Sequence, residues 1–344
     1  MPPISTGARI LVTGANGFIA AQTCSTLTQR GHTVIGTVRS KSKGEYLKKV
    51  IGDKFDYVVV ENIEKPDAFD NAVKSTNVDA VVHMASPVDT SSEDPAVVIG
   101  PAVSGTTGIL KSALEHGPSV KRIVITSSVA SLIVPKDGTY TFTESDWNTY
   151  SPSCVEQKGK NAGIHKYRAS KVLAERAAWT FMEDNKDTVK FDLTTILPPL
   201  VFGPLIHQTT SLSKLNETSI LFLKRVTNPP LQAHFPGVSG NLVDVRDVAL
   251  AHALALESDK AGGERFIVSN GPFAWQQITD ELYEAGITDI PIGVPGSWKA
   301  KPFEIIMDGS KASDVLGLKY RTIRETAVDG LNSLRERFGK EVKI

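Results

Sequence analysis

Short apolar runs alternate with helical stretches through the first 197 residues, and this alternation leaves few folds open to the chain. The runs are continuously apolar rather than alternately apolar and polar, which is typical of strands buried on both faces. The sequence therefore predicts an α/β protein with an open, doubly wound parallel sheet. We expect strands at 9–13, 33–38, 55–60, 80–83, 122–126 and 191–197, and helices near 18–30, 43–51, 67–75, 97–116 and 165–185.

The pattern becomes less regular after Pro198, where prolines interrupt the units. We interpret residues 1–195 as one domain, to which later segments at about 237–270 return, and residues 196–344 mainly as a smaller α/β lobe that binds the substrate. Such a lobe would cover the carboxyl edge of the sheet, where ligands bind in folds of this class. Its expected elements are helices near 247–258, 274–286 and 322–338 and a short strand at 265–268.

A glycine-rich turn, in the segment TGANGFIA, joins the first strand to the first helix. Gly14 permits a tight turn, Gly17 lets the backbone approach a pyrophosphate, and the small Ala20 allows the helix to pack closely on the strand. The helix N-terminus then directs free N–H groups and a positive dipole end at the phosphates. The turn predicts a Rossmann-type dinucleotide site, although its spacing is GxxGxxA rather than GxGxxG. A simple β-to-α turn is the alternative.

The residues after the second strand distinguish NAD from NADP. NAD sites place an acidic side chain about 20 residues beyond the glycines, where it binds the ribose 2′-hydroxyl. This chain has the basic segment RSKSK instead, in which Arg39 and Lys43 offer charge-assisted hydrogen bonds to a 2′-phosphate. We therefore expect NADPH/NADP+ as the cofactor, with a solvated basic loop as the alternative. Asn62, after the third strand, is expected to bind the adenine edge.

Tyr167 and Lys171 lie four residues apart in a predicted helix, so their side chains share one face. A phenol with its usual pKa of about 10 stays protonated at pH 7, and a nearby ammonium group or an oxidised nicotinamide ring favours the phenolate. The pair therefore suits proton transfer. Ser127 and Ser128 follow the fifth strand, where a serine hydroxyl can orient a carbonyl oxygen toward the tyrosine. Capping of a helix is the alternative role for such a serine.

Together, the segments TGANGFIA, RSKSK, ITSS, YRASK and LPPLVFGP resemble the extended short-chain dehydrogenase/reductase family over nearly the whole chain. They are most similar to fungal NADPH-dependent reductases of the methylglyoxal (isovaleraldehyde) type and, more distantly, to dihydroflavonol 4-reductase. The resemblance implies hydride transfer from NADPH to an aldehyde or ketone. Tyr167 would be the proton donor and Ser128 the catalytic serine, and Lys171 would bind the nicotinamide ribose and lower the pKa of the tyrosine.

The resemblance also implies a set of cofactor contacts. They are Gly14, Asn16, Gly17, Phe18, Ile19, Arg39, Lys43, Asn62, Ile63, Ala85, Ser86, Tyr167, Lys171, Pro198, Leu200 and Val201. Two positions depart from the family pattern, Asn62 where Asp is common and Leu197 where Asn is usual. Separately, apolar residues that follow the strand ends are expected to line a hydrophobic substrate pocket. These residues are Val88, Leu132, Ile133 and Leu200.

The composition excludes other classes of protein. Among 344 residues, 38 basic ones balance 38 acidic ones, so the chain lacks the positive excess typical of nucleic-acid or anionic-membrane binding. Cys24 and Cys154 are its only cysteines, which excludes a disulfide framework or a CxxC metal site, and we expect no metal. No secretory signal and no apolar run of the roughly 18 residues needed to span a membrane is expected. We therefore expect a cytoplasmic monomer or homodimer that acts on a small-molecule carbonyl substrate.

Three functions remain open at this point. A carbonyl reductase accounts for the whole constellation of Ser128, Tyr167 and Lys171. A sugar-nucleotide epimerase or dehydratase would use the same scaffold, but such enzymes usually prefer NAD, and the Arg39 segment argues against that preference. A non-catalytic NADP-sensing regulator would not need the three catalytic residues.

Overall fold

The large sheet has seven parallel strands among the residues that the structure describes. The structure is a computed structural model that describes residues 4–86, 94–227, 239–300, 302–339 and 342. The strands are β1 (Arg9–Thr13), β2 (Thr33–Val38), β3 (Phe55–Val59), β4 (Ala80–His83), β5 (Arg122–Thr126), β7 (Asp192–Leu197) and β10 (Arg265–Ile267). Their order is β10-β7-β5-β4-β1-β2-β3, which confirms the predicted doubly wound sheet. The order reverses between β1 and β4, the point at which such sheets bind their ligands.

Helices cover both faces of this sheet because successive strand residues point to opposite sides. Ile10 and Val12 of β1 join one core cluster, with α1 and α8, while Leu11 joins a second cluster on the other side. The helices against the first cluster are α1 (Phe18–Gln29), α2 (Lys41–Ile51) and α8 (Val245–Glu257). Those against the second are α3 (Asp70–Thr76), α4 (Pro95–His116) and α6 (His165–Asp184).

Helix α4 corrects one expectation from the sequence. It is long and apolar enough in composition to cross a membrane, whereas no such run was expected. However, 44% of its most apolar window is buried inside the protein. Its Ile109 and Leu110 side chains are fully buried in the core shared with α3 and the sheet, and the helix packs along α6. Its apolar character is therefore that of a core helix.

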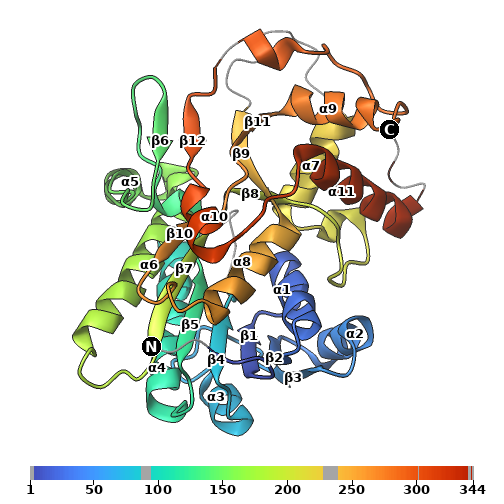
Figure 1. Cartoon of the computed structure of the whole chain (residues 1–344). Coiled ribbons are helices and arrows are strands. Elements are labelled where there is room, and N and C mark those ends of the chain that lie inside the picture. Colours follow the sequence, from blue (N-terminus) through green and yellow to red (C-terminus); the bar gives the residue numbers. More distant parts are fainter. Residues whose placement is uncertain (1–3, 87–93, 228–238, 301, 340–341, 343–344) are drawn as a thin grey trace.

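Two small sheets lie in the upper half of Figure 1, above most of the large sheet. The first contains β8 (Leu200–Phe202), β9 (Ser239–Asp244) and β11 (Pro272–Ala274) in the order β11-β9-β8, and the second pairs β6 (Tyr140–Phe142) with β12 (Ile305–Met307). The neighbouring helices are α5 (Tyr150–Lys158), α7 (Glu217–Thr227), α9 (Trp275–Glu284), α10 (Ser310–Leu316) and α11 (Ile323–Phe338). An aromatic cluster fills this lobe, in which the Phe202 ring lies 5.6 Å from Trp275 and 5.8 Å from Phe273.

The chain crosses between the two parts more than once. Beyond residue 195, α8 returns to pack against α1, and β10 completes the edge of the large sheet beside β7. Within the predicted returning segment, however, β9 pairs with β8 and β11 in the smaller sheet, so 237–270 does not return as one unit. Several helix bounds also differ by two or three residues; α2 begins at Lys41, two residues before the predicted start.

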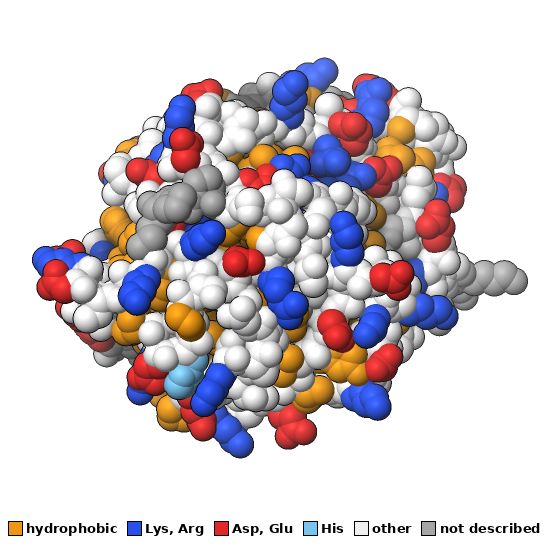
Figure 2. All heavy atoms as spheres, turned by 60° about the horizontal axis from the view of Figure 1, so that its bottom comes forward, with side chains coloured by type: hydrophobic (Ala, Val, Ile, Leu, Met, Phe, Trp, Pro, Cys, Tyr) orange, Lys and Arg blue, Asp and Glu red, His pale blue; other side chains and the backbone are white. Residues whose placement is uncertain are grey.

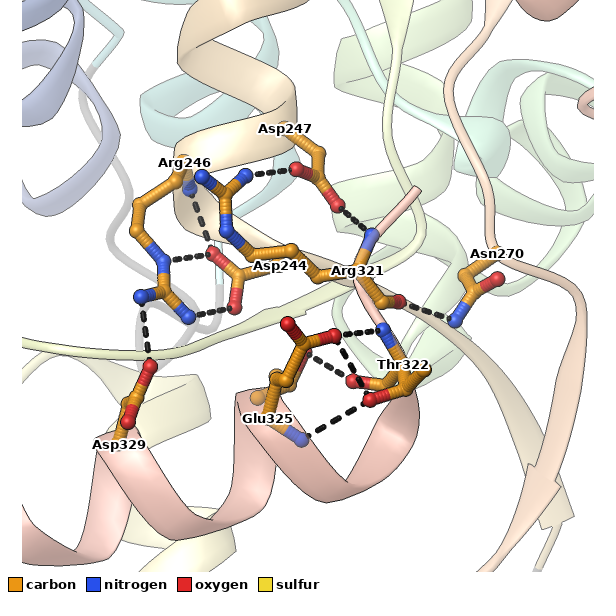
Figure 3. A network of polar contacts seen from close by, with 9 residues as sticks. Asp244, Arg246, Asp247, Asn270, Arg321, Thr322, Glu325 and Asp329 are labelled. Atoms are coloured by element: carbon orange, nitrogen blue, oxygen red, sulfur yellow. Dashed lines mark hydrogen bonds and ion pairs between the residues drawn. The ribbon is translucent and has the colours of Figure 1, made fainter. Parts of the chain in front are cut away.

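A polar network joins α8 to the segment that leads into α11 (Figure 3). The fully buried Asp247 carboxylate accepts a hydrogen bond from the Arg321 backbone N–H at 2.8 Å and pairs with the Arg321 guanidinium. Arg246 donates to Asp244 at 2.8–2.9 Å and to Asp329 of α11 at 2.6 Å. The network therefore fixes the last helix on α8, which itself packs on the large sheet.

Figure 2 shows the face of the molecule that looks downward in Figure 1. Lysine and arginine side chains are interspersed there with aspartate and glutamate, and the hydrophobic side chains form small separate patches. Among the described residues, this face has no broad area of a single charge sign. This distribution agrees with the equal numbers of acidic and basic residues in the sequence.

Candidate active site

The turn after β1 requires glycine for two separate reasons. Gly14 has φ of +66°, in the left-handed region that disfavours other residues. A Cβ atom at this position would also lie 2.9 Å from the Ala85 Cα. The Thr37 hydroxyl accepts a hydrogen bond from the Gly14 N–H at 3.0 Å, and this bond holds the turn against β2. The turn therefore brings the ends of three strands into close contact.

The N-terminus of α1 is suited to an anion. Gly17 is its N-cap residue in an extended conformation, and no side chain caps the helix. The first turn contains no acidic residue, so the positive end of the helix dipole is not neutralised by a carboxylate there. This arrangement matches the predicted pyrophosphate site.

The Thr13 hydroxyl fixes the backbone at the end of β4, beside this turn. Thr13 Oγ1 accepts hydrogen bonds from the Met84 and Ala85 N–H groups at 3.0 and 3.1 Å and lies 2.9 Å from His83 Nδ1. With both acceptor positions used, the hydroxyl donates to the histidine. Burial, together with the positive charge of Lys171, lowers the pKa of His83 to about 3. His83 is therefore a neutral, packed residue that helps to position the loop after β4.

The ends of β1, β2, β3 and β4 surround a cavity of about 570 Å³. Eight of its lining residues are predicted cofactor contacts: Gly14, Asn16, Gly17, Arg39, Asn62, Ile63, Ala85 and Ser86. Six further lining residues were not predicted: Thr37, Val38, Val60, Glu61, Glu64 and Met84. The volume lies within the range of roughly 300–1,000 Å³ that is common for small-molecule and cofactor sites.

Three cations gather at the β2 end of the cavity. Arg39 lines it, and Lys43 lies close by in the first turn of α2. Burial lowers the pKa of Lys43, and the positive charges of Arg39 and Lys214 lower it further. Lys214, in a short 3₁₀ helix at Leu212–Lys214, was not predicted, because about 170 residues separate it from Lys43 and no local pattern links them. A third cation therefore lies close to Lys43, in addition to Arg39.

Asn62 takes part in a local turn as well as lining the cavity. Its side-chain oxygen accepts a hydrogen bond from the Glu64 backbone N–H at 2.8 Å. The amide NH₂ group is therefore the part of this side chain that suits a ligand acceptor. This refines the expected adenine contact, since Asn62 would donate to the base rather than accept from it.

The three predicted catalytic residues converge beside the cavity. Ser128 follows β5, caps a 3₁₀ helix at Val129–Ser131 by accepting from the Ala130 N–H at 3.1 Å, and is hydrogen-bonded to the Tyr167 phenol. The Lys171 ammonium lies 5.8 Å from the centre of the Tyr167 ring and donates to Ser86 Oγ at 3.2 Å. Because Ser86 lines the cavity, this hydrogen bond connects α6 to it.

The electrostatics of the pair differ from the expectation. Burial raises the pKa of Tyr167, the hydrogen bond from Ser128 lowers it, and the Glu217 carboxylate raises it. The net change is upward because desolvation of the phenolate is the largest contribution, so the expected lowering of this pKa by Lys171 is not seen here. Burial lowers the pKa of Lys171 to about 8. At neutral pH the site thus contains a protonated phenol next to a cation.

Comparison with known proteins identifies the relationship. The model of the NAD dependent epimerase/dehydratase family matches residues 10–269. The chain belongs to this family. It is 36% identical over 334 residues to the NADPH-dependent methylglyoxal reductase GRE2 of Saccharomyces cerevisiae (93% of this chain, 96% of the relative). It is also 36% identical over 349 residues to the ketoreductase azaE of Aspergillus niger (95% and 98%).

A solved structure extends this likeness to the fold of the family. The crystal structure of yeast methylglyoxal/isovaleraldehyde reductase Gre2 complexed with NADPH superposes with a TM-score of 0.84. The two chains are 34% identical, and the match covers 95% of this chain and 98% of the yeast chain. The resemblance to extended short-chain dehydrogenases/reductases is confirmed.

Other predicted contacts are not among the residues that line the cavity. Phe18 begins α1 and packs edge-on against His207, with ring centres 5.6 Å apart, and Ile19 is partly buried beside it. The Pro198 carbonyl accepts from the Val129 N–H at 3.2 Å. Leu200 and Val201 form β8 and pair with β9. The roles of these residues toward a cofactor stay predictions.

The structure corrects the predicted substrate pocket at one residue. The Leu132 side chain is fully buried in a cluster with Phe142 and Met307, so it presents no surface to a substrate. Ile133 is partly exposed and packs on the same cluster, and Leu200 is also partly exposed. Val88 lies outside the described residues.

One buried acid near the site was missed by the sequence analysis. Glu175 lies one turn beyond Lys171 on α6 and is 2% exposed. The available signal was the four-residue spacing, which places its carboxylate on the inward face of the catalytic helix. Among the described residues, no group of three or more His, Cys, Asp or Glu side chains is arranged to hold a metal ion.

Proposed function

We propose that this protein is an NADPH-dependent reductase that converts an aldehyde or a ketone into an alcohol. The observation that carries the proposal is the convergence of Ser128, Tyr167 and Lys171 next to the cavity at the strand ends. The relatives named as NADPH-dependent methylglyoxal reductase and ketoreductase support it, because they match nearly the whole chain.

The residues present fit NADPH. A glycine turn and a helix N-terminus without a carboxylate suit the pyrophosphate. Arg39, Lys43 and Lys214 suit the 2′-phosphate, because charge-assisted hydrogen bonds to phosphate are stronger than neutral ones. Asn62 suits the adenine, and Ser86 with Lys171 suits the nicotinamide ribose. When bound, NADPH supplies a hydride to the carbonyl carbon.

The chain's own groups would act on the carbonyl oxygen. The Ser128 hydroxyl and the Tyr167 phenol donate hydrogen bonds to it, which orients the substrate and stabilises the negative charge that develops there. As the carbon gains its hydrogen and the C=O double bond becomes single, Tyr167 transfers its proton to the oxygen and the alcohol forms. The raised pKa of Tyr167 keeps that proton in place at neutral pH, and the Lys171 cation stabilises the phenolate left behind.

Two other functions share parts of this site. A sugar-nucleotide epimerase or dehydratase agrees with the family name, but the cation cluster and the absence of an acid after β2 favour NADP, and such enzymes usually prefer NAD. A regulator that senses NADP would need the cavity but not the converging triad. Tight retention of the cofactor through purification would favour the epimerase or dehydratase. Binding of NADP without turnover of any substrate would favour the regulator.

The decisive experiment compares NADPH and NADH oxidation by the wild type and by Tyr167→Phe with a panel of aldehydes, ketones and diketones. Loss of the proton donor is expected to lower kcat by roughly 10²–10⁴-fold, with NADPH affinity unchanged. Tyr150→Phe is the matched control, because Tyr150 is 43% exposed on α5 and outside the site. If NADPH binds tightly but no carbonyl is reduced by the wild type, the proposal fails.

A further inference from the structure

The Glu175 carboxylate has no role in the proposed reaction, yet four hydrogen-bond donors converge on it. Its Oε1 atom accepts from Arg265 Nε at 2.7 Å and from the Thr195 hydroxyl at 3.0 Å. Its Oε2 atom accepts from the Ser127 hydroxyl at 2.5 Å and from the Ser131 hydroxyl at 2.7 Å. A fully buried carboxylate with this many donors is held in one orientation.

The two serines on Oε2 flank the catalytic serine. Ser127 immediately precedes Ser128, and Ser131 ends the single 3₁₀ turn that Ser128 caps. The Ser131 N–H also donates to the Ser128 carbonyl at 3.0 Å, and the Ser131 hydroxyl lies 2.7 Å from the same carbonyl. The turn that contains Ser128 is therefore tied to one carboxylate oxygen on both sides.

The same carboxylate is part of the catalytic helix. Tyr167, Lys171 and Glu175 follow one another at four-residue intervals along α6, so they share a face. The Glu175 carboxylate thus determines where the turn that contains Ser128 lies relative to Tyr167, which belongs to the same helix as Glu175.

Arg265 balances the charge of this buried acid. It is 9% exposed, its guanidinium lies 3.6 Å from the centre of the Trp147 ring, and it donates to the carbonyl oxygens of Asp146 (2.9 Å) and Glu144. A buried carboxylate without such a partner would be costly. The ion pair therefore compensates the burial of the Glu175 carboxylate beneath the site.

We propose that Glu175 is a positioning residue that holds Ser128 against Tyr167 through Ser127 and Ser131. The inference rests on the proposed function, since it concerns the same catalytic serine. Displacement of Ser128 would weaken its hydrogen bond to the phenol, and that bond lowers the pKa of Tyr167. Loss of the carboxylate should therefore change both the rate and the pH at which the phenol ionises.

The test is Glu175→Gln, which keeps the side-chain shape but replaces one acceptor oxygen with an NH₂ group that cannot accept from the two serines. We expect kcat to fall about 10- to 100-fold, the loss typical of a small misplacement of a reacting group. The KM for NADPH should stay within about twofold, and the alkaline limb of the pH–rate profile should move to higher pH. Unchanged kcat and an unchanged limb would overturn the proposal.

Asp192→Asn is the matched control. Asp192 pairs with the buried Arg122 at 2.6 Å, and this pair joins β5 to β7 at the ends of the strands opposite to the site. The variant should lose stability but keep the wild-type kcat and pH limb. If it reproduces the kinetic loss of Glu175→Gln, general loosening of the core explains both variants, and the positioning role is refuted.

The double variant Ser127→Ala/Ser131→Ala keeps the test open if Glu175→Gln does not fold, because it removes the same two contacts and should lower kcat by the same margin, about 10- to 100-fold. Where Glu175→Gln does fold, adding it to the double variant should cost no further activity. Full additivity of the losses would contradict the inference.

If the wild type reduces no carbonyl, the positioning role can still be tested by ultraviolet titration of tyrosinate. The titration of Tyr167→Phe is subtracted to isolate the signal of Tyr167. A higher ionisation pH for Tyr167 in Glu175→Gln supports the positioning role, and an unchanged one opposes it.

Discussion

Individual side chains near the cavity each join two neighbouring strand ends. The Thr13 hydroxyl, at the end of β1, binds the histidine that ends β4 and the two backbone N–H groups that follow it. Thr37, near the end of β2, holds the Gly14 turn. Because these threonines are buried, their hydrogen bonds are protected from water and keep the cavity walls in place before any ligand arrives.

At this scale, Arg39→Ala tests the preference for NADPH. The variant is expected to weaken NADPH binding about 10- to 100-fold, because a hydrogen bond between charged partners contributes about 1.5–3 kcal/mol. Binding of NADH should change by less than about twofold, since it has no 2′-phosphate. Titration of cofactor fluorescence with each nucleotide provides the measurement.

Lys49→Ala is the control for Arg39→Ala. Lys49 is exposed and lies in the last turn of α2. Its substitution removes one positive charge, as Arg39→Ala does, but at the far end of that helix. It should leave both affinities unchanged. An equal loss of NADPH and NADH affinity in Arg39→Ala would show that the arginine supports the cavity rather than reading the 2′-phosphate.

Local sequence was sufficient to predict the residues whose positions follow from neighbouring positions in the chain. Gly14 and Arg39 follow directly from their strands, and Tyr167 and Lys171 share a helix face, so spacing alone places them. The four-residue spacing could place Glu175 on the same helix face, but the partners of Glu175 and Lys214 come from other elements, and no periodicity of the chain shows those contacts. Leu132 was misplaced because following a strand end does not reveal whether a side chain points inward or toward a ligand.

Among the elements, α11 is held on α8 by two ion pairs of unequal burial (Figure 3). Asp247 is fully buried, whereas the side chain of Asp329 is 44% exposed. Removing the partner of a buried carboxylate leaves its desolvation uncompensated, while an exposed pair contributes little. The two contacts therefore make different contributions to stability although both use an arginine.

Arg321→Ala should destabilise the protein by about 2 kcal/mol or more, because Asp247 would lose its counter-ion while remaining buried. Asp329→Ala should cost less than about 1 kcal/mol. Urea unfolding of the two variants beside the wild type gives both values. Equal destabilisation by the two changes would show that burial does not set the strength of these pairs.

The continuously apolar strands of the large sheet were predicted almost to the residue. A strand that is buried on both faces forms an unbroken apolar run, and such a run is easy to recognise in a sequence. Of the three-residue strands, β10 was predicted and β6, β8, β11 and β12 were not. Such strands are too short for an alternation to be recognised, and they are stabilised by partners far along the chain, such as β12 for β6. Tertiary contact, rather than local preference, creates them.

For the molecule as a whole, buried histidines set the response to acid. Burial lowers the pKa of His83 to about 3 and that of His207 and His252 to about 4. Above about pH 6.5 these groups are neutral in both the folded and unfolded chain. Between about pH 6.5 and 4 the unfolded chain binds more protons, so stability falls as the pH falls.

Proton uptake on unfolding measures this effect directly. At pH 5 the three histidines should together take up about three protons, and each contributes a slope of about 1.4 kcal/mol per pH unit. His207→Gln should reduce the uptake by about one proton, which calorimetry in buffers of different ionisation enthalpy can resolve. Identical uptake by the wild type and the variant would contradict the assignment of His207 as a buried neutral residue.

The late return of α8 to the large sheet governs the order in which the chain can fold during synthesis. Before α8 leaves the ribosome, the side of α1 that packs on α8 has no cover, and Arg122 lacks the Ala255 carbonyl that accepts its Nη1–H at 2.7 Å. The nascent N-terminal part therefore emerges with part of its core open and with Arg122 paired to Asp192 but without this backbone acceptor. A chaperone that recognises exposed apolar segments would have its substrate in this interval, which ends when β10 closes the sheet edge.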